Sequence, residues 1–123
     1  MQRILIVDDE VQVCGALRRL FRREDFEVET AASGPEALLK LEAFRPDVVI
    51  SDFRMPQMNG AELLAEVRRR LPLALRLILS GYSDLASVTA SVNEGEICRF
   101  ISKPWDNETL VPTIRTLLKQ REA

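Results

Sequence analysis

Five side chains that could do chemistry stand at the ends of short apolar segments. They are three carboxylates, one hydroxyl and one amine, contributed by Asp8, Asp9, Asp52, Ser80 and Lys103. A single acid after an apolar run means little, because Asp is a common turn residue. Four separate segments that end in compatible groups form a more specific pattern, which points to one shared site.

The charges of this group indicate what it could bind. The three carboxylates and Lys103 together carry a formal charge of −2. Like charges about 4 Å apart repel by a few kcal/mol at an effective dielectric constant of about 20, so such a cluster raises its pKa values or binds a cation. The chain contains no histidine. Oxygen ligands without His or Cys suit Mg²⁺, which often bridges to phosphate. Lys103 and the Ser80 hydroxyl could take up further phosphoryl charge.

Asp52 is the best candidate for a nucleophile. It follows the apolar run 48–51 and precedes a loop over 53–60. A carboxylate can attack phosphorus and form an acyl phosphate. In-line phosphoryl transfer depends mainly on positioning and on neutralising charge, which the surrounding groups could supply.

The apolar segments alternate with stretches of helical spacing, which predicts a (βα)5 chain. Strands are expected over 4–7, 26–30, 48–51, 77–80 and 100–102. Helices are expected from about residue 11, after Ser33, over Ala61–Leu71, after Ser83 or Asp84, and from Asp106. This order favours an α/β fold with a doubly wound parallel sheet and helices on both faces. The second strand alternates apolar and polar residues, as an edge strand does. Ligand sites in such sheets lie at the carboxyl ends of the strands, where all five side chains stand.

Composition narrows the class of protein further. The chain has 123 residues, 46% hydrophobic and 29% charged, which suits one soluble globular domain. Its 17 basic and 19 acidic residues argue against a dedicated nucleic-acid binder. No apolar run is long enough to span a bilayer, and the N-terminus is unlike a signal peptide, so we expect no membrane contact and a cytoplasmic location. Cys14 and Cys98 are too far apart for a metal or dithiol motif and are expected to be small core residues.

Taken together, the motifs resemble the receiver domain of bacterial two-component response regulators. The matching segments are Ile6–Glu10, Asp52–Gly60, Ser80-Gly81 and Lys103-Pro104, in order along the whole chain. The resemblance implies a chemotaxis-regulator-like, flavodoxin-like sheet with strand order 2-1-3-4-5. It also implies that residues 1–123 form a single receiver domain, the N-terminal part of a longer protein.

The resemblance implies a role for each acidic residue. Asp52 would accept a phosphoryl group from a phosphohistidine on a sensor histidine kinase. Mg²⁺, with Mn²⁺ as a substitute, would be held by Asp9, Asp52 and the backbone carbonyl of Arg54, and Asp8 would act mostly through water. Such a domain takes part in its own phosphotransfer and dephosphorylation and is a signalling module rather than a turnover enzyme.

The remaining motif residues would couple the site to a surface. Lys103 would pair with Asp52 and the phosphoryl group, Ser80 would bond a phosphoryl oxygen, and Phe100 stands at the family's switch-aromatic position without the frequent tyrosine hydroxyl. A cis peptide bond is expected before Pro104. This switch would act on the surface of the fourth helix, fifth strand and fifth helix, where the family docks an output domain or forms a homodimer.

Residues near these motifs lead to three further expectations. Arg54 and Tyr82 follow the phosphoacceptor and the switch serine by two residues and are expected to control water access. A narrower resemblance connects the chain to receivers fused to HD-GYP phosphodiesterases or sigma-54-dependent activators. Trp105 could anchor a partner or pack over the start of the last helix.

Two other functions share part of this chemistry. A pseudo-receiver, which acts only as an interaction module, usually loses an acid or the lysine, and none is missing here. An Asp-nucleophile phosphatase of the haloacid-dehalogenase type would carry a second Asp two residues after its nucleophile, where Arg54 stands.

Overall fold

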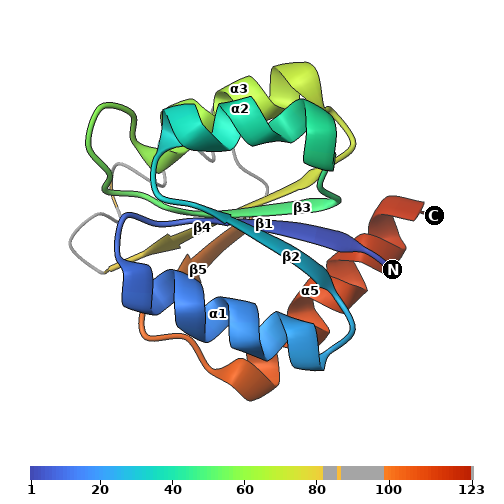
Figure 1. Ribbon diagram of the computed structural model, residues 1–123. Coiled ribbons are helices and arrows are strands. Elements are labelled where there is room, and N and C mark those ends of the chain that lie inside the picture. The colour runs from blue at the N-terminus through green and yellow to red at the C-terminus, as the bar shows by residue number, and fades with distance from the viewer. Residues whose placement is uncertain (82–85, 87–98, 123) are drawn as a thin grey trace.

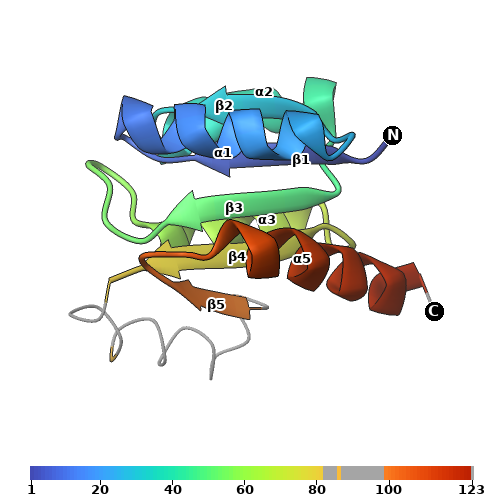
Figure 2. The same ribbon diagram turned by 90° about the horizontal axis from the view of Figure 1, so that it is seen from below.

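The computed structural model describes residues 1–81, 86 and 99–122 and contains one five-stranded parallel sheet (Figures 1 and 2). The strands are β1 (Arg3–Val7), β2 (Glu27–Ala31), β3 (Val48–Asp52), β4 (Leu75–Ser80) and β5 (Arg99–Ser102). Their order across the sheet is β2-β1-β3-β4-β5, and every neighbouring pair is parallel. The predicted fold class and strand order are confirmed.

Burial explains why these segments form strands. β3 and β4 are buried at every residue, as central strands covered on both sides should be. β2 lies at the edge of the sheet and is exposed or half-buried over its first four residues, which confirms the edge position predicted from its alternation. β5 is the other edge strand.

Helices cover both faces of the sheet. They are α1 (Val11–Arg23), α2 (Gly34–Phe44), α3 (Gly60–Arg70) and α5 (Asn107–Glu122). In Figure 1, α2 and α3 lie above the sheet, and α1 and α5 lie below it. The fourth predicted helix and Cys98 lie outside the described residues.

Local sequence signals set the starts of two helices. The Ser33 side chain accepts a hydrogen bond from the Glu36 amide at the start of α2, and Pro35 stands in the first turn. Asn59 and Glu62 form a reciprocal capping box at the start of α3. These caps fix where each connection from the preceding strand ends.

Two hydrophobic clusters hold the layers together. One packs α1 and α5 against the sheet around Phe21 and Ile114, and the other packs α2 and α3 around Leu41 and Leu64. Trp105 packs against the first cluster. Its indole nitrogen donates to Asn107 Oδ1 at 2.8 Å, which supports packing over the start of the last helix.

Cys14 was expected to be a small core residue. Cys14 is half-buried at the margin of the first cluster, and its thiol donates to the Asp8 carbonyl at 3.3 Å. It is therefore less enclosed than a core residue.

Within the described part of the chain, no helix is both long and apolar enough to cross a membrane.

Candidate functional site

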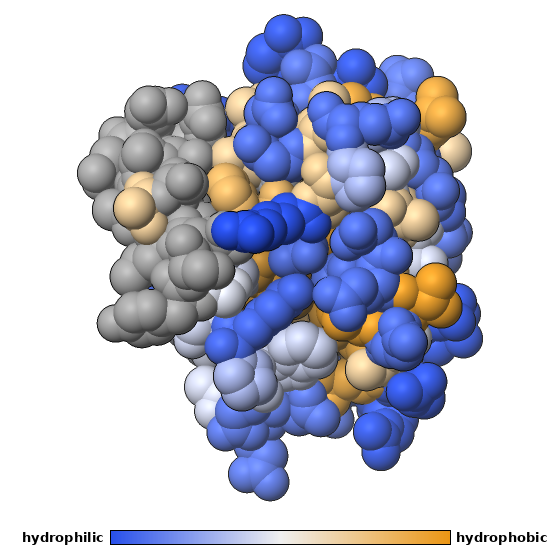
Figure 3. All heavy atoms as spheres, turned by 90° about the vertical axis from the view of Figure 1, so that its left-hand side faces the viewer, coloured by the Kyte–Doolittle hydropathy of each residue, from blue (hydrophilic) through white to orange (hydrophobic). Residues whose placement is uncertain are grey.

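The predicted site residues meet at the carboxyl edge of the sheet. Asp52 and Ser80 are the last residues of β3 and β4, and Asp8 and Lys103 directly follow β1 and β5. The register sets Val7 beside Ser51 and Asp52 beside Leu79, so the neighbouring strands end at the same level. Figure 3 looks onto this edge, where hydrophilic groups surround smaller apolar areas.

Lys103 links two of the carboxylates. Its Nζ donates to Asp52 Oδ1 at 3.0 Å and lies 3.7 Å from Asp8 Oδ2. The Phe53 amide also donates to Asp52 Oδ1, at 2.9 Å. Asp52 is therefore held from two sides, and its residue is only 8% exposed.

Asp8 is the most deeply buried of the three acids, with 2% of its surface exposed. Its Oδ1 accepts a hydrogen bond from the Glu10 amide at 2.8 Å. Its Oδ2 is buried and, among the described residues, has no hydrogen-bond partner. A buried oxygen without a donor calls for a cation or a water molecule at this position.

Burial also changes the acidity of the site. It raises the pKa of Asp8 to about 6, and the Asp52 charge adds to this rise, against the opposing Glu10 amide and Lys103. Burial likewise raises the pKa of Asp52, although the hydrogen bond and charge of Lys103 oppose it. Burial lowers the pKa of Lys103, but the bond to Asp52 and the two carboxylate charges outweigh it, so the net shift is upward. The site is therefore short of positive charge.

The three carboxylates can converge on one ion. Asp8, Asp9 and Asp52 each offer an oxygen, and these atoms lie within 4.8 Å of one another. The donor set is all oxygen, and Asp8 Oδ2 accepts no hydrogen bond from the described residues. Hard oxygen donors beside an uncompensated charge fit a Mg²⁺-sized cation. Asp9 is exposed, so it faces the side from which an ion or a phosphodonor would arrive.

A hollow of about 390 Å³ opens beside this cluster. Asp9, Phe53, Arg54 and Asn59 are among the residues that line it. Arg54 thus lines the same hollow as Asp9, and both the coordinating role of its carbonyl and its control of water access stay predictions. Tyr82, the other residue expected to control access, lies outside the described residues.

Gly60 is a site residue whose role the motif alone did not explain. A Cβ at this position would lie 2.4 Å from the Asp52 carbonyl oxygen and 2.9 Å from Ile78 Cδ1. The Gly60 amide also donates to the Phe53 carbonyl at 2.8 Å. The loop after β3 can therefore close against the end of that strand only with a glycine here.

Ser80 and Phe100, the predicted switch residues, lie on the adjacent strands β4 and β5. Ser80 is fully buried, and its carbonyl accepts a hydrogen bond from the Lys103 amide at 2.9 Å. Phe100 pairs with Ile78 in the sheet and packs, half-buried, against the cluster under α2 and α3. The Lys103–Pro104 peptide bond is cis, as the resemblance implies.

Comparison with known proteins decides the family. The model of the response regulator receiver domain matches residues 4–115. The chain belongs to this family. As a receiver domain of two-component response regulators, it is a signalling domain, and the resemblance stated from its motifs is confirmed.

Curated relatives are longer proteins. The hydrogenase transcriptional regulatory protein HoxA of Cupriavidus necator is 42% identical over 112 residues, which cover 91% of this chain and 23% of that protein. The DNA-binding transcriptional regulator NtrC of Salmonella typhimurium is 31% identical over 116 residues, covering 93% of this chain and 24% of that protein. The chain spans about a quarter of the length of these relatives.

Solved structures share the whole fold. A response regulator receiver domain protein from Clostridium thermocellum has a TM-score of 0.91 at 28% identity, and 99% of this chain and 98% of that chain are covered. The signal receiver domain of an HD domain-containing protein from Pseudomonas fluorescens Pf-5 has a TM-score of 0.91 at 34% identity, with 98% and 97% covered. The similarity to this protein, to HoxA and to NtrC is consistent with the narrower resemblance to receivers that are joined to output domains.

Proposed function

We propose that this receiver domain accepts a phosphoryl group on Asp52 from a phosphohistidine of a sensor histidine kinase. The observation that carries the proposal is the position of the Asp52 carboxylate, held by Lys103 and the Phe53 amide beside two further acids. A carboxylate oxygen of Asp52 would attack phosphorus, and the bond from phosphorus to the histidine nitrogen would break. The product is an acyl phosphate on Asp52 and a free histidine on the kinase.

Each side chain around Asp52 would have its own role in this transfer. Lys103 places a positive charge beside the phosphoryl group, and Ser80 supplies a hydroxyl donor at its oxygens. Asp9, Asp52 and the Arg54 carbonyl would hold Mg²⁺, with Asp8 acting through water. When bound, the ion would supply charge compensation on the phosphoryl oxygens, with Mn²⁺ as a substitute.

The phosphorylated site would be coupled to a distant surface. Ser80 would turn toward the phosphoryl group, and Phe100 would repack into the space that it leaves. The two states differ in their contacts with the phosphoryl group, which biases their equilibrium. The surface that responds would include β5 and α5 together with the fourth predicted helix, either as a homodimer contact or against an output domain.

The relatives suggest the setting of this switch. HoxA and NtrC are transcriptional regulators, and the matched part is about a quarter of each. We therefore infer that the domain is the N-terminal part of a longer cytoplasmic protein and controls its output domain, without binding nucleic acid itself.

Phosphorylation can be tested by intact mass. The purified chain is incubated with acetyl phosphate, with and without Mg²⁺, and compared with Asp52→Asn. We expect one phosphoryl group per chain that requires Mg²⁺, is lost in alkali and is absent from the variant. Asp25→Asn is the matched control, because Asp25 is an exposed acid on the connection after α1. No adduct on the wild type under any condition would favour an interaction module that works without phosphorylation.

A further inference from the structure

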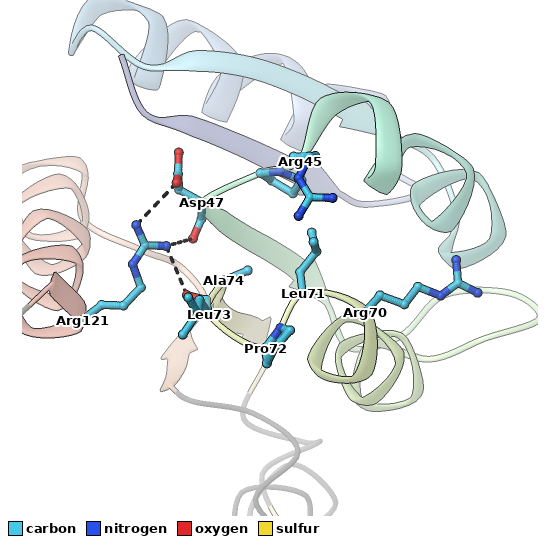
Figure 4. A pocket seen from close by; sticks show the side chains of 9 residues that line it. Arg45, Asp47, Arg70, Leu71, Pro72, Leu73, Ala74 and Arg121 are labelled. Atoms are coloured by element: carbon cyan, nitrogen blue, oxygen red, sulfur yellow. Dashed lines mark hydrogen bonds and ion pairs between the residues drawn. The ribbon is translucent and has the colours of Figure 1, made fainter.

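A second hollow lies at the end of the sheet opposite Asp52. This basal pocket has a volume of about 470 Å³ and is lined by residues 45–47, 70–74 and 121 (Figure 4). These segments follow α2, end α3, precede β4 and close α5. The pocket shares no residue with the candidate phosphorylation site.

One side of the basal pocket is fixed by a hydrogen-bonded pair. The Arg121 guanidinium donates to the carbonyls of Asp47 and Leu73, each at 3.1 Å, and lies 3.4 Å from Asp47 Oδ1. Asp47 Oδ2 accepts a hydrogen bond from the Arg3 amide at 2.8 Å. The pair therefore holds α5 to the base of the sheet and needs no ligand to be satisfied.

The opposite rim carries two arginines, Arg45 and Arg70, and only Arg70 has an ion-pair partner among the described residues. Arg45 directly follows α2 as its C-cap residue and is exposed. Its backbone lies in the left-handed region, with φ 49°. In the described part of the chain its guanidinium has no hydrogen bond or ion pair, and Figure 4 shows it extending over Leu71. Arg70 shares the carboxylate of Glu66 with Arg69. Three arginines line the pocket; Asp47 pairs with Arg121 and Glu66 with Arg70, so these five side chains together carry a net charge of +1.

The space between these charges is apolar. Leu71, Pro72, Leu73 and Ala74 form one wall, and Leu73 is 78% exposed at the rim. A large apolar side chain in water is stabilised when a partner covers it. A ligand that suits this pocket therefore brings an apolar group together with negative charge.

We propose that the basal pocket docks a peptide segment of a partner protein in which leucine-like side chains are flanked by carboxylates. The carboxylates would pair with Arg45 and Arg70, whose planar guanidinium groups suit bidentate contacts. The apolar side chain would cover Leu73 and occupy the space beside Leu71. A nucleic-acid backbone suits the pocket less well, since it offers charge but no apolar group. This site goes beyond the proposed phosphorylation and does not depend on it.

Titration by heteronuclear NMR tests the proposal. The probe is a capped hexapeptide, Glu-Leu-Glu-Glu-Leu-Glu, added to the ¹⁵N-labelled chain at fixed ionic strength. We expect saturable shifts of the amides of Asp47, Leu71, Leu73 and Ala74, with a dissociation constant on the order of 1 mM or below. The peptide with Ser in place of Leu should bind at least about fivefold more weakly, because the apolar contact is lost.

Variants separate the basal pocket from general attraction by charge. Arg45→Glu should weaken binding about tenfold or more, since it removes a charge-assisted contact and adds repulsion. Arg19→Glu is the matched control, an exposed arginine on α1 outside the pocket, and should change binding less than twofold. The amide spectrum of each variant reports whether it is folded.

Several results would overturn this assignment. They are an absence of shifts with the leucine peptide, equal binding of the serine peptide, equal losses in both variants, or larger saturable shifts with a short DNA duplex. Asp52→Asn should bind the peptide as the wild type does. Failure of the phosphorylation test would therefore leave this result unchanged.

Discussion

Replacing the buried carboxylate of Asp8 by an amide should stabilise the metal-free protein at neutral pH. The folded protein raises the pKa of Asp8 from its ordinary value of 3.8 to about 6, chiefly by burial. The folded state therefore binds a proton more tightly than the unfolded state. The contribution of this group to the free energy of unfolding is greatest below about pH 4, decreases as the pH rises and reaches its minimum above about pH 6.

The size of this effect follows from the pKa. A rise from 3.8 to about 6 corresponds to about 3 kcal/mol of destabilisation when Asp8 is fully ionised. The Asp8 side chain is 1% exposed, so screening by solvent reduces this energy only slightly. An asparagine keeps an oxygen for the Glu10 amide and carries no charge. We therefore expect Asp8→Asn to exceed the wild type in stability by roughly 1–3 kcal/mol above about pH 7 and by much less at about pH 4.

The assay is urea unfolding across this pH range with EDTA, followed by the fluorescence of Trp105, the single tryptophan. Saturating Mg²⁺ should stabilise the wild type by mass action and stabilise Asp8→Asn less. Asp25→Asn, at an exposed position, should follow the wild type at every pH. A difference between Asp8→Asn and the wild type that does not change with pH, or a variant that is less stable at about pH 8, would refute the argument from an uncompensated buried charge.

Three further predictions concern the loop that closes the site, and urea unfolding measures each. Gly60→Ala should lose roughly 1–3 kcal/mol and slow phosphorylation, because its Cβ would lie 2.4 Å from the Asp52 carbonyl; unchanged values in both assays would contradict this contact. Gln57→Gly should gain about 1 kcal/mol, since Gln57 has φ 71°, and no gain would mean that this backbone carries no strain. Asn59→Ala should lose about 1 kcal/mol by removing the capping box of α3, and a neutral result would show that solvent replaces the cap.

The sequence predicted the fold because local and long-range signals agree in it. Strands that are apolar throughout became the buried centre, and the alternating segment became the edge strand β2. The start of β4 differs, since the apolar run predicts residue 77 and the strand begins at Leu75. Arg76 interrupts the run, yet it is 8% exposed and pairs with Val49 in the sheet. Pairing with the neighbouring strand, which local hydrophobicity does not encode, extends β4 here.

The site was predictable in its residue types but not in its environment. The motifs name Asp8 and Asp9 as adjacent acids, whereas the fold buries the first and exposes the second. Asp8 lies against Lys103, which is distant from it in the sequence, and the motifs do not encode this contact. The close approach of Gly60 to Asp52 and the basal pocket also depend on packing between distant segments, and no spacing in the sequence encodes them.

We propose that Asp52, and not its acidic neighbours, carries the phosphoryl group. The most direct measurement is borohydride reduction of the acetyl-phosphate-treated chain, followed by peptide mass mapping. Reduction of an aspartyl phosphate gives homoserine, so we expect homoserine at position 52 alone and only when Mg²⁺ was present. Homoserine at position 8 or 9, or none at any position, would contradict it.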